Sequence, residues 1–289
     1  MPAIDVTPVK LSRQMLGLTS LPINFSISKT PTHCLQLEST MKTILLVLIT
    51  LLIRPAFAED IDVTDDKISA AMKSDIRSDA DRDRDGNRRP VKTLEFFGLR
   101  DDMKVVELLP GGGWYTKILA PTLQENGEFY VALGPGRVKE RLAGKPGFED
   151  MNITAEDAKL WRPEGSRFYS LEVDGLGVTD ADIVFTFRNY HNFDAAGRAA
   201  MNKAAYDALK TGGVYAVVDH TRRHMDSDSP ENRRRLAPVL AIKEIQQAGF
   251  ESVDFSDLHG RPDDEQRYEV GRKTVTRNTD RWTLKFVKT

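Results

Sequence analysis

The chain has 289 residues, of which 40% are hydrophobic and 29% charged, the composition of a soluble globular protein with one or two domains. Its formal net charge of −2 argues against the strong positive field of a protein that binds nucleic acid or acidic membranes. The single cysteine, Cys34, excludes an internal disulfide and a cluster of thiolate metal ligands.

Residues 41–58, MKTILLVLITLLIRPAFA, have the pattern of a secretory signal peptide. Lys42 gives a basic start, residues 44–53 form an apolar run, and Ala56-Phe57-Ala58 matches a small-residue cleavage site. The run is short for a membrane span, although an uncleaved anchor or a buried helix would look similar. We therefore expect a periplasmic or secreted protein with no stable membrane insertion after cleavage.

Residues 1–40 show no sustained periodicity and contain scattered serine, threonine and proline. Because a signal peptide belongs at the start of a protein, we hypothesise that translation begins at Met41. Residues 1–40 would then be an upstream mis-start without a fold. The mature protein would begin near Glu59 and contain no cysteine.

Residues 59–100 are polar and charged and predict a helical N-terminal extension. Pro90 suits the first turn of a helix within this segment, and Gly98 suits its C-terminal cap. Charged residues at steps of three and four predict one broad, salt-bridged helix face. These residues are Arg77, Asp81, Arg84, Asp85 and Arg88.

Residues 101–289 alternate between strand and helix patterns, which predicts one domain with a parallel sheet covered on both faces. The predicted strands are 104–109, 128–133, 167–171, 182–187 and 214–218, and the predicted helices are 114–123, 195–210 and 235–248. Residues 249–256 and 281–288 predict a late antiparallel pair. Ligands of such sheets bind beyond the carboxyl ends of the strands, so we expect functional residues in the loops that follow them.

The loop after the first strand, VVELLPGGGWY, combines an acid, three glycines and the start of a helix. It does not match the dinucleotide pattern G-x-G-x-x-G, because Thr116 takes the place of the third glycine. A methyl-donor loop has an acid, an apolar residue and G-x-G-x-G. Glu107, Gly111 and Gly113 match that pattern, and Leu109 replaces the first glycine. A tight packing turn would also use these glycines.

From about residue 74 onward, the chain resembles a family of secreted, predicted class I S-adenosylmethionine-dependent methyltransferases. The resemblance rests on E-L-x-P-G-G-G-W-Y together with DRDRDGNRRPVKTLEFFGL, FTFRNYHNF, VVDH, AGF and DRWTLKFVK. It implies a Rossmann-like α/β fold with a seven-stranded, mostly parallel sheet and helices on both faces. It also implies S-adenosyl-L-methionine as the cofactor.

The resemblance further implies residue roles. It implies a lid over the cofactor that contains Asp81, Arg84, Asp85 and Arg88. The residues implied to bind the cofactor are Glu107, Pro110, Gly111, Gly112, Gly113, Trp114, Tyr115, Asp174, Arg188, Asn189 and Tyr190. Asp174 would meet the adenine. The second strand ends in Leu133 and Gly134, where the fold normally has an acid that holds the ribose, so we expect weak or differently supplied ribose binding.

Two polar groups, RNYHN and VDH, follow the fourth and fifth strands. His191 or His220 suits proton transfer near neutral pH, and Asp219 can orient a histidine ring. We therefore predict that His191, Asp219 and His220 are catalytic. As an alternative, His220 and His224, four residues apart, could bind a metal on a helix with Asp219 or His191.

Together these features predict a methyltransferase that acts on an unknown, small-molecule acceptor. We find no basic groove with interleaved aromatic residues for nucleic acid. Two alternatives remain, an extracytoplasmic binding protein that keeps the fold without methyl transfer and a metal-assisted hydrolase. The first alternative fits an exported protein, because the cofactor is made in the cytosol. The oligomeric state stays open.

Overall fold

The computed structural model describes residues 56–289, and their side chains from residue 63 onward. Residues 55–289 form one compact unit. Cys34, the predicted mis-start and all but the last three residues of the predicted signal peptide lie outside the described residues. Within the described part, no helix combines the length and the apolar character needed to cross a membrane.

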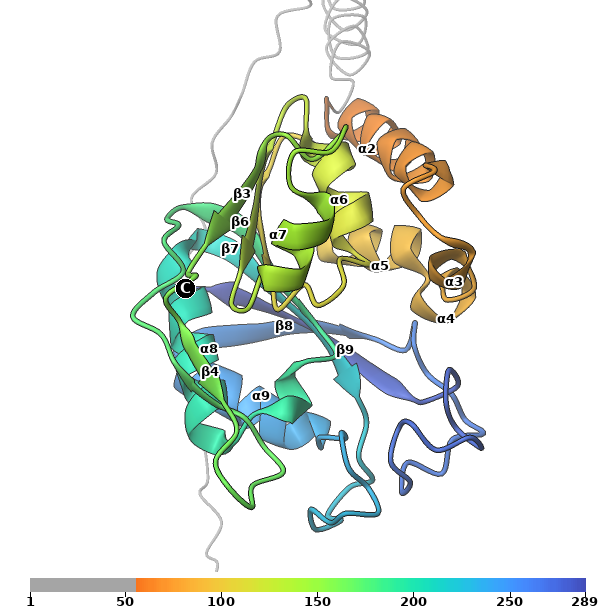
Figure 1. Cartoon of the computed structure of the whole chain (residues 1–289), viewed down its shortest axis with the longest axis vertical. Coiled ribbons are helices and arrows are strands. Elements are labelled where there is room, and N and C mark those ends of the chain that lie inside the picture. The colour runs from red at the N-terminus through yellow and green to blue at the C-terminus, as the bar shows by residue number, and fades with distance from the viewer. Residues whose placement is uncertain (1–55) are drawn as a thin grey trace, which may run out of the picture. The chain divides into compact units, whose positions relative to one another are not determined.

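A seven-stranded sheet forms the centre of the unit, with the strand order β3-β2-β1-β6-β7-β9-β8 (Figure 1). Neighbours from β3 to β7 are parallel, and β9 is antiparallel to both β7 and β8. The strands are β1 (Lys104–Leu108), β2 (Glu128–Ala132), β3 (Met151–Thr154), β6 (Ala181–Phe187), β7 (Leu209–His220), β8 (Phe250–Ser256) and β9 (Arg281–Lys288). The mostly parallel sheet and its late antiparallel pair are confirmed.

Helices cover both faces of the sheet, as predicted, because successive strand residues point to opposite sides. On one face, Val106 and Leu108 of β1 pack in a core with α8 (Ala195–Ala208) and α9 (Pro238–Gln247). On the other face, Val105 packs in a second core. The helices of that core are α2 (Ala56–Lys73), α5 (Pro90–Phe97), α6 (Thr116–Leu123) and α7 (Gly136–Leu142).

The N-terminal segment is helical, but the single charged helix face predicted from its sequence is wrong. The segment contains α2, two short helices and α5, and the short helices are α3 (Asp79–Arg82) and α4 (Asp85–Arg88). Ser78 caps α3 in a capping box, and Arg89 takes a left-handed conformation (φ 42°) between α4 and α5. Arg77 precedes the Ser78 cap, Asp81 lies in α3, and Asp85 and Arg88 lie in α4 beyond the C-terminal cap of α3 at Asp83, so the charged residues do not share one helix. α5 begins at Pro90, and Gly98 caps its C-terminus, as predicted.

The predicted position of the third strand of the main sheet is also wrong. The sequence did not predict β3, a short edge strand with no fully buried residue and therefore no strong apolar pattern. The predicted strand 167–171 gives β5 (Ser170–Glu172), which pairs with β4 (Lys159–Trp161) in a separate two-stranded sheet. The β4–β5 hairpin therefore lies outside the main sheet, next to α8.

Candidate functional site

Three connected cavities lie beyond the carboxyl ends of β1, β6 and β7. The glycine-loop cavity, of about 350 Å³, lies between the loop after β1 and the segment that contains α3 and α4. It contains most of the predicted cofactor and lid residues. Those that line it are Asp81, Arg84, Arg88, Glu107, Pro110, Gly111, Gly112, Trp114, Tyr115, Arg188 and Asn189.

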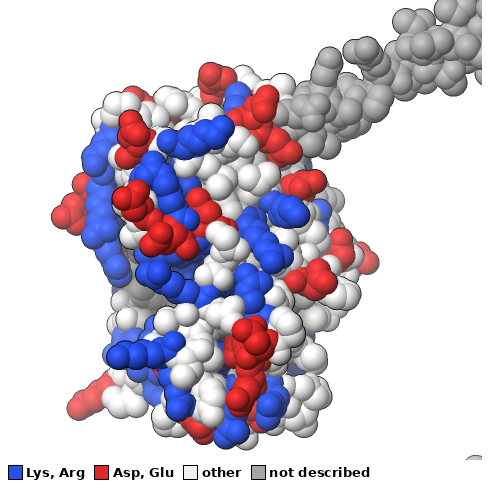
Figure 2. Space-filling model, turned by 90° about the vertical axis from the view of Figure 1, so that its right-hand side faces the viewer, with Lys and Arg blue, Asp and Glu red and all other residues white. Residues whose placement is uncertain are grey.

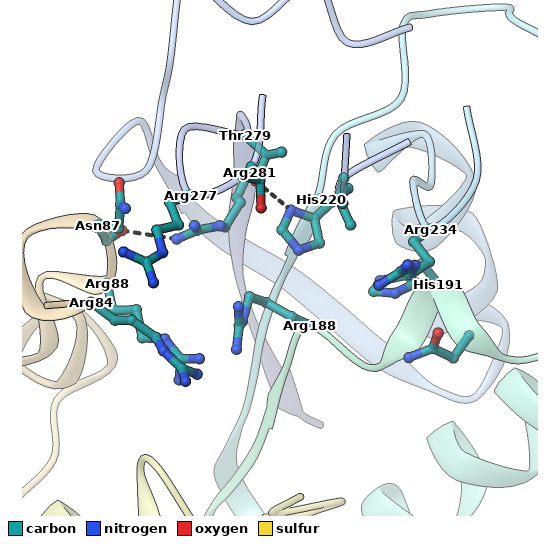
Figure 3. A pocket seen from close by; sticks show the side chains of 14 residues that line it. Arg84, Asn87, Arg88, Arg188, His191, His220, Arg234, Arg277, Thr279 and Arg281 are labelled. Carbon is teal, nitrogen blue, oxygen red and sulfur yellow. Dashed lines mark hydrogen bonds between the residues drawn. The ribbon is translucent and has the colours of Figure 1, made fainter. Parts of the chain in front are cut away.

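The arginine cavity, of about 430 Å³, lies beside the glycine-loop cavity (Figure 3). His191 and His220 line it, together with six arginines. The six arginines are Arg84, Arg88, Arg188, Arg234, Arg277 and Arg281. The first three of them also line the glycine-loop cavity, so the two cavities share a wall.

The hairpin cavity, of about 380 Å³, lies between the end of β2 and the β4–β5 hairpin. Gly134, Leu160, Tyr169 and Phe193 give it apolar and aromatic surface. It shares Leu109, Gly111 and Asn189 with the glycine-loop cavity, and Asn192 and Arg234 with the arginine cavity. None of the described residues that line it is acidic, so no carboxylate there could hold ribose hydroxyl groups.

Three neighbouring strands turn in the same way where they reach these cavities. Leu109 (φ 54°), Leu133 (φ 61°) and Arg188 (φ 60°) follow β1, β2 and β6, and each takes the left-handed conformation that glycine usually supplies. The Leu109 N–H donates to the Ala132 carbonyl (2.9 Å), and the Arg188 N–H donates to the Val218 carbonyl (2.7 Å). Neighbouring strands therefore hold these strained turns in place.

The glycines of the first loop divide into two kinds. A side chain on Gly111 would meet nothing closer than the Leu109 carbonyl oxygen at 4.0 Å, so the loop is open to a ligand there. A side chain on Gly113 would come within 2.9 Å of Leu142 and 3.2 Å of Val138. Gly113 lines none of the three cavities, and its place in the predicted cofactor set is better explained by packing against α7.

Glu107 is a buried carboxyl group at the floor of the glycine-loop cavity. Only 3% of its surface is exposed, and the Thr116 hydroxyl donates a 2.6 Å hydrogen bond to its Oε2. Burial raises the pKa of Glu107 to about 7, although the Thr116 hydrogen bond and the charge of Arg88 act in the opposite direction. A cationic ligand group beside it would favour the ionised carboxylate.

Three of the four predicted lid residues, Asp81, Arg84 and Arg88, line this cavity from the segment that contains α3 and α4. Trp114 Nε1 donates to the Asp81 carbonyl oxygen (2.9 Å), and Lys117 Nζ donates to the Asp81 carboxylate (2.7 Å). The Arg88 guanidinium lies 4.2 Å from the centre of the Trp114 ring. Asp85 lines none of the three cavities and instead binds the buried Arg77 in a two-pronged ion pair, which holds α4 against the end of α2.

The predicted catalytic residues come together across the ends of β6 and β7. Asp219 is fully buried and accepts hydrogen bonds from the His191 backbone N–H (2.8 Å), from His191 Nδ1 (2.5 Å) and from the His220 backbone N–H (2.6 Å). The ring that Asp219 orients is therefore that of His191, rather than that of its neighbour His220. His191 Nε2 has no hydrogen-bond partner among the described residues, so it can accept a proton.

His220 has a different environment. The Thr279 hydroxyl lies 2.9 Å from its Nδ1, and its ring centre lies 5.6 Å from that of His191. Burial lowers the pKa of His220 well below its usual value, and the positive charges of Arg281, Arg188 and Arg235 lower it further. His220 thus stays neutral, and its ring faces the arginine cavity as a polar wall.

Asn189 and Tyr190 are adjacent in sequence but take opposite roles. Asn189 Nδ2 donates to the Leu109 carbonyl (3.0 Å) and to the Phe187 carbonyl (3.1 Å), so it ties the loop after β6 to the loop after β1. Tyr190 is fully buried in the core, where its hydroxyl meets Asn202 (2.8 Å) and Glu244 (3.2 Å). The predicted contact of Tyr190 with a cofactor is therefore wrong.

Two further predicted site residues lie outside the cavities. Asp174 is exposed and follows β5, which is not a strand of the main sheet, so it is absent from all three linings. His224 is exposed in a loop, where the helical spacing to His220 does not exist. Among residues 63–289, no group of three or more His, Cys, Asp or Glu side chains is arranged to hold a metal ion.

One wall of the arginine cavity was not predicted from the sequence. Arg277 and Thr279 precede β9 and Arg281 begins it. Figure 3 shows Arg277 and Arg281 above Arg84 and Arg88. Because β9 runs antiparallel, its start lies at the edge where the parallel strands end. In the sequence, the basic segment that precedes the last predicted strand could have indicated this wall.

His259 connects this wall to the N-terminal segment. Its Nε2 lies 2.9 Å from the Arg88 carbonyl oxygen, and its Nδ1 lies 2.7 Å from the Thr283 hydroxyl. Burial lowers the pKa of His259 to about 4, so the ring is neutral at ordinary pH. The segment before β9 and the α4–α5 junction are thus held together by one buried side chain.

No family model matches the sequence, and a search of curated proteins finds no similar one. Solved structures do match. An S-adenosylmethionine-dependent methyltransferase from Aquifex aeolicus is 15% identical, with a TM-score of 0.51 over 71% of this chain and 93% of that chain. The cyclase SpnF is 14% identical, with a TM-score of 0.50 over 70% of this chain and 80% of that chain.

The chain therefore has the α/β fold of the class I S-adenosylmethionine-dependent methyltransferases. Identities this low establish the fold alone, and one of the two similar structures is named as a cyclase. In such a fold, the residues of the site determine the reaction.

Proposed function

We propose that this protein is an S-adenosylmethionine-dependent methyltransferase with a small-molecule acceptor. The observation that carries the proposal is the glycine-loop cavity, in which a buried acid, an open glycine backbone and an aromatic ring meet at the carboxyl end of β1. Ligands of doubly wound sheets bind at this edge.

The residues of this cavity fit the methionine half of the cofactor. Glu107 and Asp81 offer carboxylates to its ammonium and sulfonium groups. The ring of Trp114 already has the guanidinium of Arg88 4.2 Å from its centre and therefore positions that arginine. Arg84 and Arg88 offer charge to its carboxylate. Gly111 leaves the backbone accessible from the cavity.

The nucleoside half would extend into the hairpin cavity, which adjoins the glycine-loop cavity at Leu109, Gly111 and Asn189. The exposed Leu160 and the half-buried Tyr169, whose ring has the Arg162 guanidinium 4.3 Å from its centre, offer surface to an adenine ring there. The buried Leu133 stands where the fold normally has an acid that binds the ribose. The ribose hydroxyl groups would therefore bind water or neutral side chains. We therefore expect weaker cofactor binding than the fold usually provides.

The bound cofactor would supply a methyl group on a positively charged sulfur, ready for in-line displacement by a nucleophile. The protein would mainly position the two reactants. His191 would take the proton of the acceptor at Nε2, while Asp219 holds the ring by its Nδ1 proton. Asn189 would keep the cofactor loop in register with His191.

The test is calorimetric titration with S-adenosylmethionine and with S-adenosylhomocysteine. Saturable binding is expected, and Glu107→Gln should weaken binding of S-adenosylmethionine about 10- to 100-fold, because a buried charged partner is lost. Glu95→Gln, at an exposed position of α5, is the matched control and should bind like the wild type. Absence of binding at millimolar ligand would overturn the proposal.

Export is part of the same proposal. The signal-peptide pattern at residues 41–58 supports a periplasmic or secreted protein. Mass spectrometry of the protein from its native source is expected to find an N-terminus near Glu59. Peptides from residues 1–40 would contradict both the export and the translation start at Met41.

A further inference from the structure

The charge inside the arginine cavity is of one sign. Six arginines line it, and none of its described lining residues is acidic. Figure 3 shows Arg277 and Arg281 above Arg84 and Arg88, with Arg188 beside them and below His220. The formal net charge of the whole chain is −2, so this positive charge is local. On the face that Figure 2 shows, Lys and Arg are interspersed with Asp and Glu.

Few of these arginines are neutralised by the protein. Arg234 pairs with Glu269 at 3.2 Å, and Arg281 Nη1 donates to the Asn87 carbonyl oxygen at 2.8 Å. In the described part of the chain, the guanidinium groups of Arg84, Arg88, Arg188 and Arg277 make no hydrogen bond or ion pair. The Nε atoms of Arg188 and Arg281 are buried without an acceptor among residues 63–289. Unpaired buried donors cost free energy, so their presence points to a ligand.

The buried arginines also repel one another. Burial lowers the pKa of Arg88, and the charges of Arg188, Arg84 and Arg281 lower it further. Burial likewise lowers the pKa of Arg281 to about 10, and Arg188 adds to the effect. Asp219 attracts Arg188 and Arg281, but its oxygens are already bonded to His191 and His220. A bound anion would remove this repulsion.

The size and position of the cavity limit which class of ligand it can bind. A cavity of about 430 Å³ accepts a small molecule, and guanidinium groups on several sides suit the oxygens of phosphate or carboxylate groups. His191 lines the same cavity, so a ligand held by its anionic group would have its other end near His191 Nε2.

We propose that the arginine cavity is the acceptor site, and that the acceptor is a small molecule with two or more negative charges, as in a phosphate ester or a polycarboxylate. This inference rests on the proposed function in one respect only, that the bound anion is the methyl acceptor. Binding of the anion itself requires no cofactor.

The experiment is a titration with pyrophosphate, citrate and acetate at constant ionic strength, followed by calorimetry and thermal unfolding. Pyrophosphate or citrate is expected to bind saturably, with a dissociation constant of about 1 mM or tighter, and to raise the melting temperature. Acetate should bind at least about tenfold more weakly, since it carries one charge. Tighter binding of pyrophosphate would indicate a phosphate ester, and tighter binding of citrate a polycarboxylate.

Two variants locate the site. Arg277→Gln changes an exposed lining residue without a hydrogen bond, and Arg188→Gln changes a central one; each should weaken the preferred anion about tenfold. Arg223→Gln, on an exposed loop outside the cavity, is the control and should bind like the wild type. Equal affinities in all four proteins, or no saturable binding, would overturn the inference.

A separate titration with S-adenosylhomocysteine keeps the two proposals apart. Arg277 lines the arginine cavity but not the glycine-loop cavity, so Arg277→Gln should leave the affinity for S-adenosylhomocysteine unchanged. Anion binding without S-adenosylhomocysteine binding would support the anion site and contradict its role in methyl transfer. The reverse result would keep the proposed function and remove the anion site.

Discussion

His191 Nδ1 lies 2.5 Å from Asp219 Oδ1, and this contact joins the loop after β6 to the end of β7. Asp219 also accepts the backbone N–H of His191, so it fixes both the ring and the chain that bears it. A neutral imidazole that donates from Nδ1 must present its lone pair at Nε2. The arrangement prepares His191 to accept a proton without further rearrangement.

Replacing Asp219 tests this relationship. Asp219→Asn keeps the size of the side chain but removes the charge from a buried group that accepts three hydrogen bonds. We expect a loss of about 1.5–3 kcal/mol in the free energy of unfolding, measured by urea denaturation. We also expect nitrogen NMR to show that the Nδ1–H tautomer of His191 is less populated.

Asp174→Asn is the control for this change, because Asp174 is exposed and lines none of the cavities. Its free energy of unfolding should stay within about 0.5 kcal/mol of the wild type. Equal losses in both variants, with an unchanged His191 tautomer, would show that Asp219 does not orient the ring.

Glu107 gives the protein a specific pH dependence. Its pKa is about 7 when folded and 4.5 for the free group, so the folded protein binds more protons than the unfolded chain between those values. The stability that Glu107 contributes is present below about pH 4.5 and lost as the pH rises through about 7. Because glutamine does not titrate, the Glu107→Gln variant does not lose this stability as the pH rises. Relative to the wild type, the variant should gain on the order of 3 kcal/mol between pH 5 and pH 8.

The measurement for Glu107 is the difference in free energy of unfolding between the two proteins at each pH. Using the difference cancels other titrating groups, such as His259, whose lowered pKa has the opposite effect on stability. A difference that does not change with pH would mean that Glu107 is solvated rather than buried.

At Leu109, a glycine substitution should give a more stable protein than an alanine substitution, the reverse of the usual order. Both Leu109→Ala and Leu109→Gly lose the same packing around a partly buried side chain. Alanine keeps the strain of the left-handed backbone at φ 54°, whereas glycine removes it. Thermal unfolding should therefore find the glycine variant more stable than the alanine variant by about 1 kcal/mol. The opposite order would show that the loop does not hold this conformation in solution.

Gly111 and Gly113 form a matched pair, because both have positive φ, at 60° and 80°. Gly111→Ala should cost only the backbone strain of about 1–2 kcal/mol. Gly113→Ala adds a contact of 2.9 Å with Leu142 and should be the less stable of the two. Conversely, Gly111→Ala should weaken S-adenosylhomocysteine binding more than Gly113→Ala does. Equal effects on binding would identify the loop as a packing turn only.

The sequence predicted that functional residues follow the parallel strands, because such strands end at one edge of the sheet. Glu107, Gly111 and His191 could be found in this way. The wall that contains Arg277 and Arg281 could not, because the sequence does not show that β9 lies between β7 and β8, which brings the start of β9 to this edge. Tyr190 misled the prediction, since its polar neighbours face the cavities while its own ring turns into the core.

The charged N-terminal segment shows a second limit of sequence patterns. Steps of three and four describe a helix only while the helix continues, and here the Ser78 cap and the C-terminal cap of α3 at Asp83 interrupt it. The residues still reach the glycine-loop cavity, because the broken turns fold over it. The predicted helix is wrong, and the predicted role of these residues as a lid stays a prediction.

The position of β9 has a consequence for the order of folding. β8 has a partner in the main sheet only through β9, which is later in the chain and lies between β7 and β8. The contact from His259 to Arg88, which joins the walls of the arginine cavity, spans 171 positions. Closing such long loops is slow, so we expect this cavity to assemble last as the chain folds. The appearance of anion binding during refolding would then mark the moment at which the native topology is complete.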